Sequence, residues 1–397
     1  MFNTYTPMQY LAIDIANHYG LDKEVYEVRI QWVKDNIDKL EELDVDADEP
    51  ILYRKAGNAL RMTQQGLPTG HTTALDAVCS GLQLMSVVMG CKAGCALTGL
   101  IHSDVRTDAY TLITQAMNRK VFVEVTRKQA KSAVMKGLYG SLAAPKEVFG
   151  DLTPLFYETL NEECPGAMDL LEMLRAAWSD KVDRNSWQLP DGYLAMVPIT
   201  QKVESRIHVA QLKYTPVVTH SVVTPLEQGV SLIANVVHSI DAYVLRTMVR
   251  RLNYSPKMVR MLLHTLKRFD GVYRDCDSNY LDVWNDTGIV DMTVIEATDR
   301  EIYGFPADMR EKLISMLEMC LEHKPFELVL IHDSFACHPN NCNQLRKTYA
   351  NILADLCDST LIDDLLNQVY QSADVVQKYG NTKELAATIR QSNYGIS

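Results

Sequence analysis

The sequence predicts a mixed α/β fold that is rich in helices. Apolar residues at three- and four-residue steps indicate helices, and they fall in the segments 10–20, 23–43, 126–141, 238–252 and 340–356. Pro and Gly punctuation around alternating β-forming residues predicts a hairpin within 190–222. Two further segments begin as strands. Residues 73–90 start extended and turn helical, and residues 327–335 form an apolar strand that ends in charged residues.

Composition bounds the class of protein. A chain of 397 residues predicts two or three globular units, and 47% hydrophobic with 22% charged residues is typical of a protein with a sizeable core. No 18 consecutive residues are apolar, and the first residues lack the basic and apolar regions of a signal peptide. The nine cysteines are irregularly spaced, so we expect reduced thiols, with Cys91 and Cys95 in the core and not in a zinc site.

The charge distribution is uneven. A net charge of −11 argues against a protein that simply coats DNA, although it does not exclude a local basic surface. Residues 35–49 carry eight Asp or Glu, whereas residues 246–268 carry seven Lys or Arg and no acid. The basic run is open to two interpretations, a nucleic-acid contact or a solvated helix face.

Two acids stand where strands end. ELVLIHDSF predicts a buried strand, LVLI, followed by His332 and Asp333. An acid there is costly to bury unless it is paired or binds a cation. Asp76 lies at the strand-to-helix junction of ALDAVCSGLQL, and small residues such as Gly81 follow, which would let a nucleotide approach closely. Each acid alone is also consistent with a helix cap or a salt-bridged surface group.

The helix predicted at 126–141 is the most informative element. Arg127, Lys131, Met135 and Tyr139 stand at four-residue steps, and therefore on one slowly drifting face. Two cations at one end suit a triphosphate, and Met and Tyr at the other end suit a base and a ribose. A solvated basic helix with a stripe of core residues would show the same spacing.

The segment VVHSIDAYVLR places His238 and Asp241 three residues apart on a helix. A histidine in this setting is more often structural than functional. A functional role for this pair is therefore supported only when the other segments are considered with it.

Four segments, in this order, resemble the single-subunit RNA polymerases of T-seven-type phages and mitochondria. ALDAVCSGLQ, RKQAKSAVMKGLYGS and HDSFACHP resemble the three catalytic motifs of that family, and VVHSIDAYVLR resembles the histidine helix between the second and third. Weaker similarities are GLDKEVYEVRIQWV, DAYTLITQAMN with Tyr110, and LPDGYLAMVPI, which resembles the start of the promoter-specificity hairpin. SNYGIS resembles the family's C-terminal segment, and we expect the chain to end natively at Ser397.

The resemblance implies a right-hand polymerase fold with palm and fingers, helix-rich, lacking an N-terminal domain and a thumb. We expect N-terminal helices and the first part of the palm at 1–109, and fingers with a specificity-hairpin-like region at 110–224. The second part of the palm is expected at 225–397. His238 and Asp333 stand further apart than the family requires, which predicts an insertion at about 247–310.

The resemblance also implies the chemistry, which is nucleotidyl transfer to an RNA 3′ end with two Mg²⁺ ions. Asp76 and Asp333 would hold the metal, and the backbone carbonyl of Ala77 would add a ligand. Mg²⁺ is usually held by one or two carboxylates together with substrate phosphates.

The nucleotide site follows from the same motifs. Arg127 and Lys131 are expected to hold the triphosphate, with Lys131 also a proton donor to pyrophosphate. Tyr139 and His238 would distinguish ribose from deoxyribose. The other residues expected in contact with the NTP are Met135, Gly140, Tyr110 and His332.

A basic motif that precedes GLDK in the family is also missing. A polymerase divided here resembles the larger, catalytic subunit of the heterodimeric middle-gene RNA polymerases of N-four-type podoviruses. The resemblance therefore implies a smaller partner subunit, a DNA template, an RNA product, and a possible single-stranded-DNA-binding recruitment factor. We expect the protein in the cytoplasm of an infected bacterium, without a membrane association.

Two alternatives compete. A DNA polymerase of the related A family also carries Lys and Tyr eight apart, but with an aromatic residue midway, where this chain has Met135. Comparing ribonucleotide with deoxynucleotide incorporation separates these two. A non-catalytic scaffold would be expected to lose Asp76, Lys131 or Asp333, and all three are present.

Overall fold

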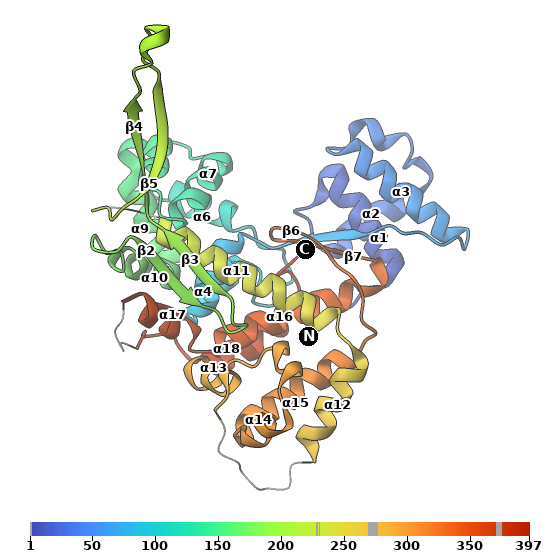
Figure 1. Cartoon of the computed structure of the whole chain (residues 1–397). Helices are drawn as coiled ribbons and strands as arrows, with labels where there is room; N and C mark the ends of the chain where they lie inside the picture. The colour runs from blue at the N-terminus through green and yellow to red at the C-terminus, as the bar shows by residue number, and fades with distance from the viewer. Residues whose placement is uncertain (1, 228, 230, 269–276, 371–374) are drawn as a thin grey trace.

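The computed structural model describes residues 2–227, 229, 231–268, 277–370 and 375–397. It is helix-rich with small antiparallel sheets, so the mixed α/β prediction is right at this level (Figure 1). No helix in the described ranges is both long enough and apolar enough to cross a membrane.

The N-terminal helices form one side of the molecule, at the right of Figure 1. They are α1 (Pro7–Ala16), α2 (Tyr26–Asp35) and α3 (Pro50–Gln64). The helix predicted at 23–43 is shorter than expected, because Asn36 ends α2: its backbone and side-chain amides both donate to the Trp32 carbonyl. The acid-rich residues that follow form two short 3-10 turns, at Ile37–Lys39 and Leu43–Asp46.

A three-stranded sheet lies at the centre, between the N-terminal helices and the helices on the opposite side (Figure 1). Its strand order is β1 (Thr73–Asp76), β7 (Ser334–Cys337) and β6 (Val329–Ile331), with antiparallel pairing throughout. The prediction that LVLI is buried holds only in part: Leu328 and Leu330 pack against the main core, whereas Val329 is 53% exposed and Ile331 is 66% exposed. β6 is an edge strand whose role is to lead into a tight turn, so it needs little core of its own.

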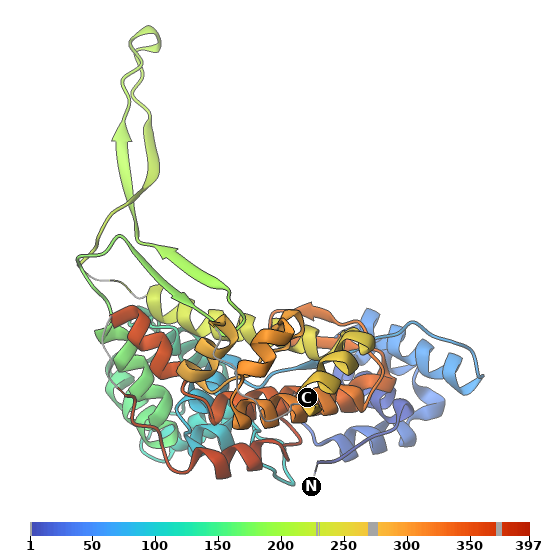
Figure 2. The same ribbon diagram turned by 60° about the horizontal axis from the view of Figure 1, so that its bottom comes forward.

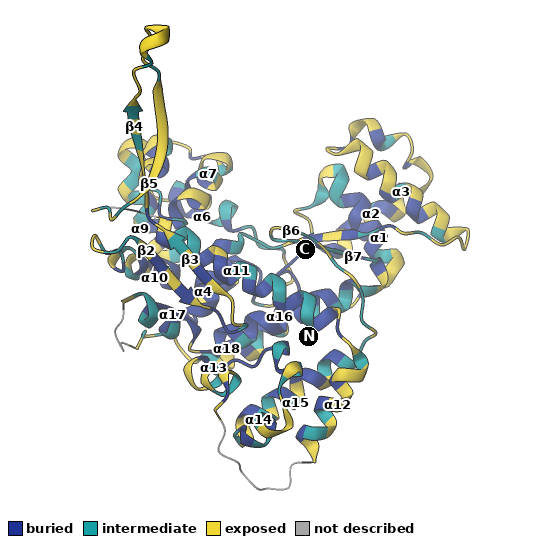
Figure 3. Cartoon of the chain, in the orientation of Figure 1, coloured by how far each residue is buried: buried dark blue, intermediate teal, exposed yellow. Residues whose placement is uncertain are grey.

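Helices behind the sheet carry most of the core. α4 (Ser80–Val88) and α16 (Cys342–Cys357) are buried almost along their whole length, as Figure 3 shows for α16. The other elements packed here are α5 (Lys92–Leu97), α11 (Ser231–Leu252) and α18 (Thr382–Ile389). The predicted helices at 238–252 and 340–356 are therefore confirmed.

The side opposite α1–α3 is built from helices that follow α5 in the chain. They are α6 (Ala109–Asn118), α7 (Arg127–Leu138), α8 (Ala143–Phe149), α9 (Thr153–Glu163) and α10 (Pro165–Ala176). α7 begins with a capping box, in which Thr126 accepts from the Gln129 amide and the Gln129 side chain accepts from the Thr126 amide. The helix predicted at 126–141 is confirmed, and its end falls just before Tyr139.

The region 190–222 holds parts of two hairpins where one was predicted. β2 (Arg184–Gln188) pairs with β3 (Leu194–Pro198), and β4 (Thr200–Arg206) pairs with β5 (Val217–Val223). The first packs on the body, where the buried Trp187 indole donates to Ser239 on α11 at 2.9 Å. The second projects away from the body in both Figure 1 and Figure 2, and β5 is exposed along its whole length.

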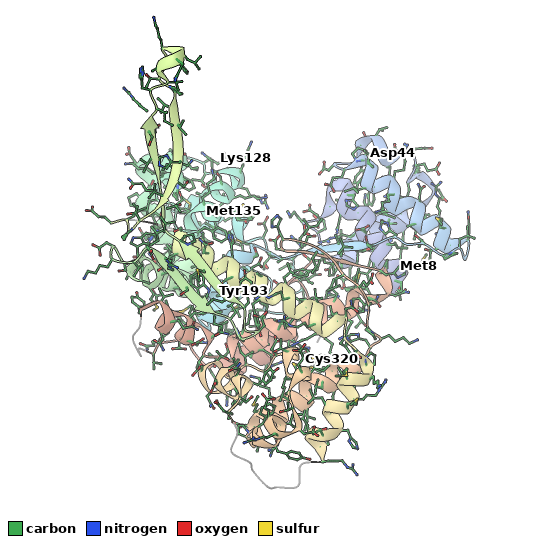
Figure 4. The ribbon with its side chains drawn as sticks, in the orientation of Figure 1. Met8, Asp44, Lys128, Met135, Tyr193 and Cys320 are labelled. Atoms are coloured by element: carbon green, nitrogen blue, oxygen red, sulfur yellow. The ribbon has the colours of Figure 1, made fainter. Side chains whose placement is uncertain are left out.

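A separate lobe lies at the bottom of Figure 1, and Figure 4 marks Cys320 in it. Its helices are α12 (Pro256–Lys267), α14 (Asp299–Gly304) and α15 (Ala307–Leu321), and α13 (Asn279–Thr287) links it to α17 (Leu361–Tyr370). Tyr254 to Cys320 include a hydrophobic cluster distinct from the main core. The insertion predicted at about 247–310 coincides in part with this lobe, although 247–252 belongs to α11 and 269–276 lies outside the described residues.

Candidate active site

Two carboxylates, far apart in sequence, stand on neighbouring backbone segments. Asp76 is the last residue of β1, and its register partner is Ser334 on β7. Asp333 follows His332 in the two-residue turn between β6 and β7, and the Ala77 amide donates to the Asp333 carbonyl at 3.0 Å. The sheet therefore presents Asp76, Ala77 and Asp333 side by side. His332 is exposed and adopts φ 54°, a left-handed conformation that the tight turn requires.

A second turn redirects the chain directly after Asp76. Cys79 adopts φ 52° at the start of α4, so the backbone leaves β1 sharply and α4 runs back into the core. Burial raises the pKa of the Cys79 thiol, which is hydrogen-bonded to Tyr110. The Ser397 amide donates to the Asp76 carbonyl at 3.0 Å, which holds the last strand residue from the other side.

One cavity of about 590 Å³ joins the carboxylates to α7. Its lining includes most of the residues that the sequence predicted for the metal and the nucleotide: Asp76, Ala77, Tyr110, Arg127, Lys131, Met135, Tyr139 and Asp333. Figure 4 shows Met135 on α7 together with Lys128, which is not part of the lining. The cavity therefore has an acidic wall from the sheet and a basic wall from α7.

Arg127 has a partner that the sequence did not reveal. Its Nε lies 2.6 Å from Oδ2 of Asp108, which also caps α6 by accepting from the amides of Tyr110 and Thr111. Burial opposes ionisation of Asp108, but the Arg127 guanidinium outweighs it and lowers the pKa of that carboxyl. The only sequence signal for Asp108 was its place before a helix, which indicates a cap and not an ion pair.

The ring of Tyr110 lies against two cations of α7, Arg127 and Lys131. Arg127 Cζ is 5.6 Å and Lys131 Nζ is 5.9 Å from the centroid of its ring. Burial, with the nearby Cys79, raises the pKa of the Tyr110 phenol well above its ordinary value, so it stays protonated. The aromatic face supports the two cations and holds them at the basic wall of the cavity.

Tyr139 and His238 meet at the far end of the α7 face. Their ring centroids are 4.8 Å apart, which brings α11 to the end of α7. A Cβ on Gly81 would lie 2.8 Å from the Tyr139 hydroxyl. The absence of a side chain at Gly81 therefore makes room for Tyr139, which is a different role from the close approach of a nucleotide that the sequence suggested. Gly140 follows with φ 96° and is buried.

Two carboxylates of the cavity, those of Asp76 and Asp333, differ from that of Asp108 in the same lining, which forms an ion pair. Within the described ranges, no hydrogen bond or ion pair joins either the Asp76 or the Asp333 carboxylate to another protein group. Burial, and after it the negative charge of Asp333, raises the pKa of the neighbouring Asp241 on α11 to about 6, although His332 lowers it. Negative charge that the protein leaves unpaired is what a bound cation would neutralise.

The donors that the cavity brings together bear on the metal prediction. Among the residues that it describes, no group of three or more His, Cys, Asp or Glu side chains could hold a metal ion by itself. Two carboxylates on one wall, with room for water and phosphate oxygens, nevertheless match the ligand set that Mg²⁺ accepts. Cys91 and Cys95 are buried free thiols, as expected for core residues.

Comparison with known proteins adds independent information. Residues 4–145 match the family model of DNA-dependent RNA polymerase. A protein described as a probable DNA-directed RNA polymerase from Neurospora crassa is 25% identical over 171 aligned residues, which cover 37% of this chain and 19% of that protein. The chain thus spans about a fifth of the length of this relative.

The matched region contains part of the cavity only. Asp76, Tyr110 and the α7 residues lie within 4–145, whereas His238 and Asp333 lie outside it. The place of Asp333 in the site rests on the motif HDSF and on the pairing of β7 with β1.

Proposed function

We propose that this chain is the catalytic subunit of a DNA-dependent RNA polymerase, which adds nucleotides from NTPs to an RNA 3′ end. The observation that carries the proposal is the shared cavity, in which Asp76 and Asp333 face Arg127 and Lys131. The match of residues 4–145 to the polymerase family model supports it independently. We also propose that the β1–β7–β6 sheet belongs to the palm and that α6–α10 belong to the fingers.

Side chains at one end of the cavity bind the triphosphate of the NTP. Arg127 and Lys131 bind the triphosphate, with Arg127 oriented by Asp108 and both cations supported by Tyr110. Lys131 would also give a proton to the departing pyrophosphate. Such positioning and charge neutralisation account for most of the catalysis in phosphoryl transfer.

The sugar end of the site is formed by Tyr139 with His238. Burial, with the charge of Asp241, raises the pKa of Tyr139 to about 12, so its hydroxyl is a neutral donor at physiological pH. A polar group that hydrogen-bonds a ribose hydroxyl discriminates against deoxyribose, because its own partner is then lost. Met135, 46% exposed, offers a flexible apolar surface to the base.

Asp76 and Asp333 are the residues that would hold Mg²⁺, together with the Ala77 carbonyl. When bound, two Mg²⁺ ions activate the attacking oxygen and neutralise charge on the leaving group. The unpaired carboxylates and the raised pKa of Asp241 support a cation at this wall.

The test uses Asp76→Asn and Asp333→Asn, with Asp38→Asn on the exposed Ile37–Lys39 turn as the control. Each site variant should extend an RNA primer at less than about a tenth of the wild-type rate, because a metal ligand is removed. Magnesium should raise the melting temperature of the wild type and of Asp38→Asn, but not that of the site variants. Normal extension by either site variant would refute the assignment of the metal ligands.

We further propose that the enzyme works as a heterodimer of the N-four phage type in an infected bacterium, with a smaller subunit and a single-stranded-DNA-binding recruitment factor. An apolar groove of about 870 Å³ along α3 supports a protein partner: Ile51 is 85% exposed and Val45 is 79% exposed beside it. Large apolar side chains exposed together are typical of protein interfaces.

Reconstitution tests the partner. Extension on a primed template should rise when the candidate small subunit is added, and Ile51→Glu should abolish that rise. Val375→Glu changes a residue of similar exposure, 86%, elsewhere on the surface and should leave the rise intact. Full processive synthesis by the lone chain would exclude a required partner.

A further inference from the structure

The cations of the basic run 246–268 fall into two groups in the folded chain, and the first group is paired with acids. Arg246 Nε lies 2.5 Å from Asp191, Arg250 contacts Asp191 and Asp291, and Arg251 lies 2.9 Å from Asp355. These arginines are at most partly exposed and are matched by acids from other elements. They join α11 to its neighbours and carry no free charge to the surface.

The remaining cations lie on α12, where the packing of the lobe forces them outward. Val259, Leu262 and Leu266 are buried in the core of the lobe. Lys257, Arg260 and Arg268 are exposed and, with the exposed His264, follow steps of three, four and four residues, so they share one face of the helix. We call this face, Lys257, Arg260, His264 and Arg268, the α12 basic face.

The α12 basic face keeps its charge. Within the described part of the chain, no acid forms an ion pair with Lys257, Arg260 or Arg268, whereas the neighbouring Lys267 is neutralised by Glu318 at 2.6 Å. α12 itself contains no acid, in a chain whose net charge is −11. Met258 and Met261 are 42% and 55% exposed beside the cations. Among the described residues, the face is therefore a strip of unpaired positive charge, on a chain whose net charge is negative.

The lobe is attached beside the segment that leads into β6 and the His332–Asp333 turn. The Phe326 amide donates to the Leu252 carbonyl at 2.9 Å, so the segment that enters β6 lies against the end of α11, just before α12. The Tyr254 hydroxyl lies 2.6 Å from the carbonyls of Cys320 and His323 and donates at this same neck. The two chain crossings between lobe and sheet are thus joined by hydrogen bonds.

We propose that the α12 basic face binds the sugar–phosphate backbone of nucleic acid that extends beyond the cleft. The proposal rests on the proposed polymerase function for the presence of nucleic acid. Lys257 to Arg268 span about 16 Å of helix at 1.5 Å per residue. A nucleic-acid strand carries a phosphate about every 3.4 Å along its axis, so several phosphates meet the strip. Charge complementarity alone supplies such contacts, without base recognition.

The experiment measures binding in place of synthesis. Labelled single-stranded DNA, duplex DNA and an RNA–DNA hybrid are titrated with the full chain, with its partner subunit where one is required, without NTPs and at several KCl concentrations. Lys257→Gln/Arg260→Gln/Arg268→Gln should reduce the slope of log Kd against log [KCl] by about 2 to 3, because each lost phosphate contact removes roughly one unit. The three ligands decide whether a single strand, a duplex or a hybrid is bound.

Matched variants separate this effect from others. Lys34→Gln/Lys383→Gln removes exposed cations on α2 and α18 and should leave the slope unchanged. Lys257→Arg/Arg260→Lys keeps the charge and should bind as the wild type does, which excludes a folding defect as the cause. Asp333→Asn should also keep the wild-type slope, so that failure of catalysis and failure of this proposal are distinguishable.

Two results would overturn the proposal. One is an unchanged salt slope in the triple Gln variant. The other is binding of a labelled polyglutamate through the same three cations that added nucleic acid does not displace. The face would then be a site for an acidic protein.

Discussion

The cavity and the neck where α11 meets the lobe differ in how their charges are matched. Around the neck of the lobe, Arg250 and Arg251 are matched by acids within the same chain. Asp76 and Asp333 line one cavity, and near it the pKa of Asp241 is raised by burial and by the charge of Asp333. Charges that are matched within the chain hold elements together, whereas charges that converge without a match indicate a ligand that supplies the opposite sign.

The two regions also differ in their cores. Phe156 belongs to the main cluster and Phe305 to the separate cluster of the lobe, and both are fully buried. A lobe with its own core can vary in stability without distorting the cavity.

Phe156→Ala and Phe305→Ala should each destabilise their own cluster by about 3–5 kcal/mol, the usual result of removing a buried phenyl ring. Thermal unfolding followed by hydrogen exchange should show α7–α10 losing protection in the first variant and α12–α15 in the second. Primer extension at low temperature should persist in Phe305→Ala. Loss of protection throughout the chain in both variants would show that the two clusters unfold as one unit.

Lys131→Ala should lower kcat/KM for NTP incorporation by roughly 100- to 1000-fold, the range for loss of one preorganised electrostatic contact in an active site. Lys136→Ala, five residues along the same helix and outside the cavity lining, is the matched control and should change little. Equal losses in both variants would indicate a general effect on α7 and not a triphosphate contact.

Asp241→Asn tests the uncompensated charge through stability. A folded-state pKa of about 6, above the ordinary 3.8, means that the contribution of the neutral carboxyl is fully present below pH 4 and is lost as the pH rises to 6. The Asn variant does not titrate, so at pH 8 it should be more stable than the wild type by about 1–2 kcal/mol after allowance for solvent screening. Near pH 4 the two should agree.

Urea denaturation in EDTA at both pH values measures this difference in the absence of divalent metal. A variant that is less stable than the wild type at pH 8 would show that the Asp241 carboxylate has a favourable partner, as the arginines at the end of α11 do.

Tyr139→Phe should produce the smallest change. Removing the hydroxyl takes away one hydrogen-bonding group worth about 1 kcal/mol, so the preference for ribonucleotides should fall by roughly fivefold while synthesis continues. Single-nucleotide incorporation with matched NTP and dNTP pairs gives the ratio. Unchanged discrimination would remove Tyr139 from the sugar-reading role and leave that role to His238.

Local patterns in the sequence predicted the helices well and part of the site. The α7 face follows from helix geometry alone, since residues four apart on one helix must lie together whatever surrounds them. The resemblance over the motifs supplied Asp76 and Asp333, and the structure places both at one cavity although 256 residues separate them, from 77 to 332. The roles of these residues remain predictions.

Other features depended on contacts between distant segments. Asp108 reads as a helix cap until α6 and α7 pack and bring Arg127 to it. LVLI has the composition of a buried strand, yet β6 lies at the edge of its sheet and leaves Val329 53% exposed.

The basic run 246–268 shows most clearly what the sequence determines and what the tertiary structure determines. The sequence by itself determined how many cations stand there and, through helical periodicity, which of them share a face. Only the tertiary structure decided which of them remain charged toward solvent, because the neutralising acids Asp191, Asp291 and Asp355 come from segments on either side of the run. Pairing of charges falls off steeply with distance, and distance between such segments is set by the fold and not by their order in the chain.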